Sequence, residues 1–370
     1  MKRFFPVSQP SIGPKEISYV SEAVSSGWVS SIGKYIEQFE TSFAAFCGTK
    51  YGLATSNGTT GLHLALAAFG VGAGDEVIVP DLTFVATANV VVHAGATPVM
   101  VDVDERTLCI DPDAIRRAIT PRSRAIMPVH LYGHPANMDA IAAIAREHKL
   151  LVIEDAAEAH GAEYHGRRVG SIGDTGVFSF YGNKVITSGE GGMLTTDNRD
   201  FYLKAKSLRD HAMSAEKRYW HTAVGYNYRM TNLQAALAVA QMERIDEFLE
   251  KRRQIMSWYR AGLEAGRNLR MNYDEPGCTS AYWMICLEID GITDQQRAVF
   301  MTRLREEGVD SRPYFYPISD MPMYQRANTP VAHMVSERGI NLPSYVDLTR
   351  QDVADICAIT RTVLGEMKLS

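Results

Sequence analysis

Short apolar runs alternate with amphipathic stretches between about Tyr51 and Asp197. Seven of the runs are near-continuously apolar, as in buried strands, and they lie at Gly52–Thr55, Glu76–Pro80, Pro98–Val103, Ala125–His130, Leu150–Asp155, Gly176–Phe180 and Gly192–Thr196. Helical periodicity separates the earlier runs, at Gly61–Phe69, Ala86–His93 and Met138–His148. This order predicts an α/β fold with a mostly parallel, seven-stranded sheet that helices cover on both faces. In such sheets, ligands bind beyond the carboxyl ends of the strands.

The pattern changes after Thr231, which is a good N-cap and forms a capping-box pattern with Gln234. Apolar residues then recur at helical spacing as far as Tyr259, which predicts one long helix that links two domains. The remaining chain predicts a smaller α+β domain, with a strand at Tyr282–Ile289, helices at Gln295–Glu307 and Arg350–Glu366, and a loop at Pro313–Tyr324. We therefore expect a large domain at residues 1–245, including the N-terminal segment, and a small domain at residues 246–370.

Composition narrows the classes of partner. The chain has 370 residues and a formal net charge of -5, without a basic block, so nucleic acid and membrane surfaces are not expected partners. The five cysteines are odd in number and form no CxxC pair, which favours free thiols in a reducing compartment. No secretory signal and no apolar run of membrane-spanning length are evident. We expect a cytoplasmic protein.

Several common sites are disfavoured by their missing signatures. His130 and His134 are four apart, but Gly133 and Pro135 argue against a helix there, and no HExxH is present, so we expect no metal site. No GxGxxG fingerprint follows a strand, which disfavours a nicotinamide-dependent enzyme. No GxSxG elbow and no P-loop are found either.

The residues with the clearest chemistry surround Lys184, which follows the strand Gly176–Phe180 and precedes the glycine-rich stretch Ser188–Gly192. Asp155 ends an apolar strand, where a buried carboxylate needs a cationic or hydrogen-bonding partner. Together these features favour pyridoxal 5'-phosphate (PLP) as the cofactor. Lys184 would hold it as a Schiff base, and Asp155 would keep its pyridine nitrogen protonated. Taken singly, a lysine is more often a solvated side chain than a catalytic group, and the aspartate is equally consistent with a cap of the next turn.

Other side chains fit the same cofactor. Gly58 and Thr59 lie at a strand-to-helix turn, where free amides and the helix dipole favour a phosphate, although an ordinary helix cap has the same pattern. Ser179 can donate to that phosphate. Phe84, just past a strand end, can stack on a pyridine ring or belong to the core. Glu158 can reach the ring hydroxyl or be a solvated loop acid.

These residues lie in motifs by which the chain resembles the DegT-type sugar-nucleotide aminotransferases, which are fold type I PLP enzymes. The resemblance runs from about Gln9 to Leu369. It rests on Gly27–Ser31, Ser56–Thr59, Gly74–Pro80, Gly95–Pro98, Glu154–Ala159, Ser179–Lys184 and Gly225–Met230. The family also contains a 3-dehydratase with a histidine in place of the lysine. Because this position is Lys184 here, transamination is favoured.

The resemblance implies a role for each matching residue. Lys184 matches the cofactor-binding lysine that also moves the proton, Asp155 the partner of the pyridine nitrogen, and Glu158 the residue near the ring hydroxyl. Gly58, Thr59 and Ser179 match phosphate ligands, and Phe84 matches the stacking aromatic. Asn227 matches a residue that reaches the phosphate across a subunit boundary, which implies a homodimer with a shared active site.

The resemblance also suggests substrates. Val129–Pro135, Arg218–His221, Arg312–Pro317 and Met321–Tyr324 are similar to segments of members that aminate GDP-4-keto-6-deoxymannose with L-glutamate as donor. By the same likeness, Trp28, Ser30, Tyr314 and Tyr316 are candidate substrate-binding residues. The sequence leaves open a UDP- or dTDP-linked sugar, and amination at C3 instead of C4. A PLP-binding regulatory protein without turnover is a further alternative.

Overall fold

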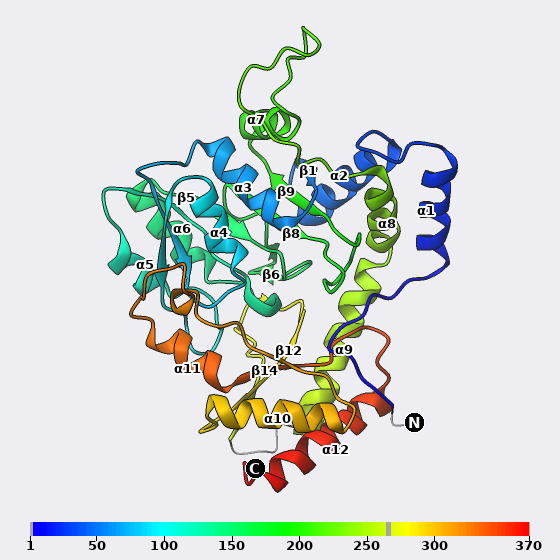
Figure 1. The fold of residues 1–370 in the computed structure, drawn as a ribbon, viewed down its shortest axis with the longest axis vertical. Coiled ribbons are helices and arrows are strands. Elements are labelled where there is room, and N and C mark those ends of the chain that lie inside the picture. Colours follow the sequence, from blue (N-terminus) through cyan, green and yellow to red (C-terminus); the bar gives the residue numbers. More distant parts are fainter. Residues whose placement is uncertain (1–2, 264–267, 370) are drawn as a thin grey trace.

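The structure is a computed structural model that describes residues 3–263 and 268–369. Its centre is a seven-stranded sheet in the order β1-β9-β8-β5-β4-β2-β3 (Figure 1). The strands are β1 (Tyr51–Thr55), β2 (Glu76–Pro80), β3 (Thr97–Val101), β4 (Ser123–Ile126), β5 (Leu151–Asp155), β8 (Thr175–Ser179) and β9 (Gly192–Thr196). Neighbours pair in parallel except at β9, which is antiparallel to β1 and β8. All seven predicted strands are thus confirmed as members of one mostly parallel sheet.

Both faces of this sheet are buried because successive side chains alternate between them. Val77 and Val79 of β2 pack in one core with apolar residues of α3, α4 and α7, whereas Ile78 packs in another core with residues of α2, α5, α6 and α8. These helices are α2 (Lys34–Cys47), α3 (Gly58–Phe69), α4 (Ala86–His93), α5 (Pro112–Ala118), α6 (Met138–His148), α7 (Arg199–Arg209) and α8 (Asn232–Met242). The prediction of helices on both faces is confirmed.

The C-terminal part contains a four-stranded antiparallel sheet in the order β10-β12-β14-β13. Its strands are β10 (Leu269–Met271), β12 (Ile285–Ile289), β13 (Arg312–Pro313) and β14 (Gly339–Leu342). The helices of this part are α9 (Ile245–Leu263), α10 (Asp294–Glu306), α11 (Pro330–Arg338) and α12 (Arg350–Glu366). Short strands β6 (Glu163–Tyr164), β7 (Arg167–Arg168) and β11 (Cys278–Thr279) form a third sheet, in the order β11-β6-β7.

The predicted long helix after Thr231 is two helices. The capping box of Thr231 and Gln234 is present, but α8 ends at Met242 and α9 begins at Ile245. The periodic apolar pattern continues across the break, so it gives no sign of it. Tertiary contacts hold the junction, since Glu243 pairs with Lys15 and Arg244 pairs with the buried Glu16, both of α1 (Pro14–Ser25).

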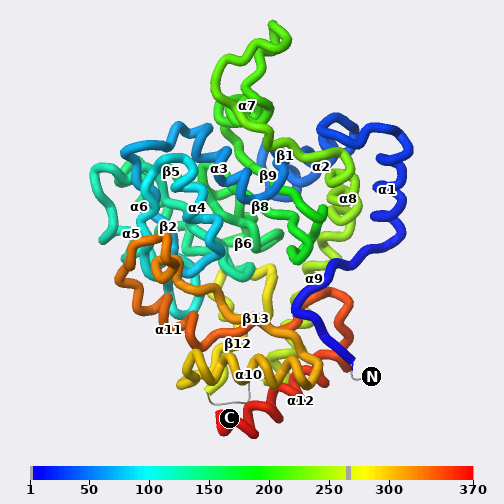
Figure 2. The backbone as a smooth tube through the Cα atoms, viewed as in Figure 1, coloured from blue at the N-terminus to red at the C-terminus, as the bar shows by residue number. Residues whose placement is uncertain are grey.

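The N-terminal segment crosses to the C-terminal part (Figure 2). Phe5 pairs with Val309 and packs in the core formed by α9, α10, α12 and the four-stranded sheet. The predicted division into residues 1–245 and 246–370 stays a prediction, and its boundary would fall in the first turn of α9.

Two further expectations concern the cysteines and the membrane. All five cysteines are free thiols in the structure, in line with the expectation from their odd number and the missing CxxC pair. Within the described part of the chain, no helix is both long and apolar enough to cross a bilayer.

Candidate active site

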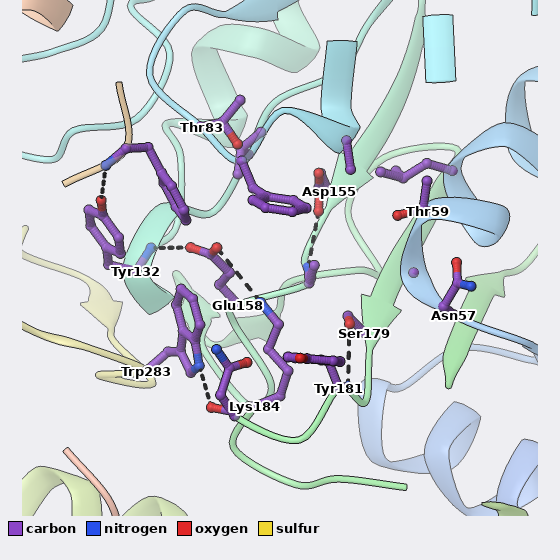
Figure 3. A pocket seen from close by; sticks show the side chains of 18 of the residues that line it. Asn57, Thr59, Thr83, Tyr132, Asp155, Glu158, Ser179, Tyr181, Lys184 and Trp283 are labelled. Carbon is purple, nitrogen blue, oxygen red and sulfur yellow. Dashed lines mark hydrogen bonds and ion pairs between the residues drawn. The ribbon is translucent and has the colours of Figure 1, made fainter. Parts of the chain in front are cut away.

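A cavity of about 790 Å³ opens beyond the carboxyl ends of β1, β5 and β8 (Figure 3). Residues near the seven-stranded and the four-stranded sheet line it, because the segments before β12 and around β13 reach over the strand ends. Seven of the predicted site residues lie in its wall: Gly58, Thr59, Phe84, Asp155, Glu158, Ser179 and Lys184. The structure therefore brings together residues that are spread over 127 positions of the sequence, from 58 to 184.

The N-terminus of α3 forms one end of the cavity. Asn57 caps the helix by accepting a hydrogen bond from the Thr60 amide at 2.8 Å, while the amides of Gly58 and Thr59 precede the first intrahelical bonds. A Cβ atom on Gly58 would lie 2.9 Å from Cβ of Ser179, so only glycine lets β8 approach the helix this closely. The free amides at the start of α3 and the side chains of Thr59 and Ser179 thus lie in the wall of one cavity, an arrangement that suits a phosphate.

Asp155 lies at the centre of the cavity wall. One carboxylate oxygen accepts from the Thr87 hydroxyl at 2.8 Å, and the other accepts from the Ala157 amide at 3.2 Å. Burial raises the pKa of Asp155, while the bond from Thr87 opposes this effect. A cation placed at this carboxylate would restore its charged form, as the protonated nitrogen of a pyridine ring can do.

Glu158 and Lys184 form a buried ion pair. Nζ of Lys184 lies 3.7 Å from Oε1 of Glu158, whose Oε2 accepts from the Tyr132 amide at 2.9 Å. Burial lowers the pKa of the Lys184 amine and raises the pKa of Glu158 to about 7. Since a neutral amine is the nucleophile, burial favours the form of Lys184 that can attack a carbonyl.

The charges of the site fit a cationic ring with an anionic tail. Asp155 and Glu158 are 5% and 4% exposed, and Lys184 supplies one positive charge for the two carboxylates. A ring nitrogen that carries a proton would offset the second carboxylate, and the α3 terminus would hold a phosphate. Phe84, which is 55% exposed, presents an apolar surface in the same cavity. These residues fit PLP.

Five predicted residues lie away from this cavity. Trp28 and Ser30 are exposed, and their carbonyls accept bonds from Asn232 at the start of α8. Tyr314 is 1% exposed and packs behind the wall against Tyr132, and Tyr316 is exposed near Arg297. Asn227 is also exposed, and its side chain accepts from Arg229. None of the five lines the cavity within this chain, so their predicted roles stay predictions.

Sequence reasoning missed three residues that shape the site. Thr87 hydrogen-bonds Asp155, the Tyr132 amide fixes Glu158, and the ring of Trp283 lies 3.9 Å from Nζ of Lys184. Tyr132 belongs to the stretch Val129–Pro135, which was noted as an unsuitable metal site and as part of the family resemblance, but not for contacts to Glu158 or Lys184. The position of Thr87, one helical turn after Phe84, was a weak signal of its role. No local pattern marked Trp283.

The comparisons with known proteins agree with this geometry. The chain matches the DegT/DnrJ/EryC1/StrS aminotransferase family over residues 10–361. It is 46% identical to a GDP-perosamine synthase of Caulobacter vibrioides over 363 residues, which cover 97% of this chain and 98% of the relative. A GDP-perosamine synthase of Vibrio cholerae is 42% identical, with 95% and 97% covered.

Solved structures show the same likeness. An aminotransferase from Psychrobacter cryohalolentis has a TM-score of 0.91 at 33% identity, and the match covers 99% of this chain and 100% of the other. A Streptococcus pneumoniae protein, described as a sugar aminotransferase and solved in its PLP form, has a TM-score of 0.94 at 27% identity, with 98% and 99% covered. The chain therefore belongs to the DegT/DnrJ/EryC1/StrS aminotransferase family.

Proposed function

We propose that this aminotransferase uses PLP to move the amino group of L-glutamate to the C4 ketone of a nucleotide-linked 4-keto-6-deoxysugar. The single observation that carries the proposal is the buried amine of Lys184, placed in one cavity with Asp155, Glu158 and a helix N-terminus that suits a phosphate. When bound, the cofactor supplies a reactive carbonyl and an electron sink, which no side chain of the protein has.

The side chains of the chain have separate tasks in this reaction. Gly58, Thr59 and Ser179 bind the phosphate, and Asp155 holds a proton on the ring nitrogen with the help of Thr87. Lys184 removes a proton from the donor and later delivers one to the sugar carbon. Phe84 and Phe315, whose ring centroids are 5.9 Å apart, form apolar walls that exclude water from the reacting atoms.

The acceptor in this proposal is GDP-4-keto-6-deoxy-D-mannose, which would give GDP-perosamine. The support is the identity of 46% and 42% to two GDP-perosamine synthases over nearly the whole chain. A UDP- or dTDP-linked sugar and amination at C3 are the alternatives.

The experiment follows the absorption of the purified protein. L-glutamate should replace the band of lysine-bound PLP with a pyridoxamine-like band, and GDP-4-keto-6-deoxy-D-mannose should restore it and yield an aminosugar. Lys184→Ala should lower turnover by about 10²–10⁴-fold, because the group that moves the proton is lost. A Lys184→Ala protein with full activity would overturn the assignment, and faster restoration by a UDP- or dTDP-linked ketosugar would replace the proposed acceptor.

We also propose that the protein is a cytoplasmic homodimer in which Asn227 completes the active site of the partner. Residues 210–224 follow α7 and extend from the body of the molecule (Figure 1). Tyr219 and Val224 in this segment are 75% and 89% exposed, which is typical of side chains that a second chain covers. The free thiols support a reducing compartment.

A further inference from the structure

The amine of Lys184 lies between an aromatic ring and a carboxylate. Nζ is 3.9 Å from the centroid of the Trp283 ring and 3.7 Å from Oε1 of Glu158. Trp283 is only 4% exposed and lines the cavity, although it comes from the segment before β12, about 100 residues after the lysine. Figure 3 shows the Lys184 side chain alongside Trp283, with its amine directed at Glu158.

Hydrogen bonds fix the orientation of Trp283. Its indole nitrogen donates to the Asn183 carbonyl at 2.8 Å, so the ring is tied to the backbone that carries Lys184. Its own carbonyl accepts from Arg252 at 3.0 Å and from Ser344 at 2.9 Å. The ring therefore cannot turn away from the lysine without loss of the hydrogen bond to Asn183, which is partly shielded from water.

Tyr132 holds both neighbours of the amine. Its amide donates to Glu158 at 2.9 Å, and its carbonyl accepts from the Trp283 amide at 3.1 Å. The backbone of Tyr132 is left-handed, with φ 53° and ψ 16°, a conformation that non-glycine residues rarely adopt. One peptide turn thus sets the distance between the carboxylate and the indole.

We propose that Trp283 is a positioning residue that confines the Lys184 amine to the space between the indole face and Glu158. This rests on the proposed function, in which Lys184 moves protons at the reacting carbon. A free lysine side chain has many rotamers, and a productive proton transfer needs only a few of them. The π face attracts the ammonium form, and the indole covers one side of the amine against water.

The first test compares Trp283→Leu with Trp283→Phe in the PLP-loaded protein. Single-turnover rates with saturating glutamate, expressed per bound cofactor, should fall at least about tenfold in Trp283→Leu and stay within about threefold in Trp283→Phe, which keeps a π face. Phe300→Leu, in the separate core of the C-terminal part, is the control for lost packing and should keep the parental rate. A Trp283→Leu rate within threefold of the parent would overturn the proposal.

The second test needs no turnover. The cofactor-free chain captures added PLP through the unprotonated amine, so the pH midpoint of capture reports the pKa of Lys184. The other titratable groups that act on this amine are Glu158, Asp155 and His160, and every variant keeps them. Trp283→Leu should move the midpoint to lower pH because the ammonium form loses the π face.

The two tests separate the failure of this inference from the failure of the proposed function. An unchanged or higher midpoint would overturn the role of Trp283. A parent protein that binds PLP but does not respond to glutamate would overturn the proposed function, while the midpoint would still decide whether Trp283 acts on Lys184.

Discussion

Glu158 has a carboxyl group whose protonation is set by burial. It is 4% exposed, and burial raises its pKa from 4.5 to about 7, although Lys184 and the Tyr132 amide favour the charged form. The folded protein without cofactor therefore retains this proton between pH 4.5 and about 7, where the unfolded chain has lost it. Since the folded state binds more protons, this group lowers the free energy of unfolding as the pH rises through that window.

We predict that Glu158→Gln removes this dependence in the cofactor-free protein. Between pH 5 and pH 8, the free energy of unfolding of the variant should rise relative to the parent by up to about 3 kcal/mol, the equivalent of the shift. Urea unfolding at the two pH values measures the change. Glu190→Gln, at a less buried acid in the same cavity, is the control and should show a smaller change. A pH-independent difference between Glu158→Gln and parent would contradict the raised pKa.

At the scale of elements, the loop after β13 is attached to the large sheet by an aspartate. Asp81 follows β2 and is fully buried. Its carboxylate accepts from the amide and the hydroxyl of Ser319, both at 2.7 Å, and from the Thr329 hydroxyl. Arg312 and Phe315 in the cavity wall lie just before this attachment, so the wall is fixed to the carboxyl end of β2.

We predict that Asp81→Ala loosens this wall, because three buried donors lose their acceptor. Amide exchange of residues 317–329 should accelerate, and the KM for the nucleotide sugar should rise about tenfold or more, with little change in the glutamate half-reaction. Asp81→Asn is the matched control. An asparagine can still accept from the Ser319 amide and can donate to the two hydroxyls, so both properties should stay near those of the parent. Parental amide exchange and a parental KM in Asp81→Ala would show that the carboxylate contacts do not hold the wall.

At the scale of the whole molecule, the cavity has no contact with Asn227 within one chain, which is consistent with a site shared by two chains. We predict that Lys184→Ala and Asn227→Asp proteins, each nearly inactive, regain activity when they are mixed and allowed to exchange subunits. In a mixed dimer, one site would combine Lys184 of one chain with Asn227 of the other. Random exchange should restore about a quarter of the parental activity.

The measurement is an activity assay after subunit exchange, with sedimentation to establish the dimer. The Lys184→Ala protein mixed with itself is the control. If each site used residues of one chain only, every site of the mixed dimer would carry one substitution, and no activity would return.

The large sheet and its ligand-binding edge can be predicted from the pattern of apolar residues along the chain. Each of the seven strands is a short apolar run bounded by polar turns, and this local signal is strong because both faces of a parallel sheet are buried. Four site residues were identifiable for the same reason, because each lies at the end of a strand or shortly after it: Gly58, Asp155, Ser179 and Lys184. The break between α8 and α9 was not identifiable, because it depends on α1 contacts far away in the sequence.

The surroundings of the lysine amine, in contrast, depend on how distant segments of the chain pack together. Trp283 and Tyr132 come from segments about 100 and 50 positions away from Lys184, and neither has a local pattern that links it to the lysine. The pKa of Glu158 likewise follows from burial, which depends on how the C-terminal part covers the strand ends. Strand periodicity is a property of neighbouring residues, whereas the contacts around an active-site amine depend on the packing of the whole chain.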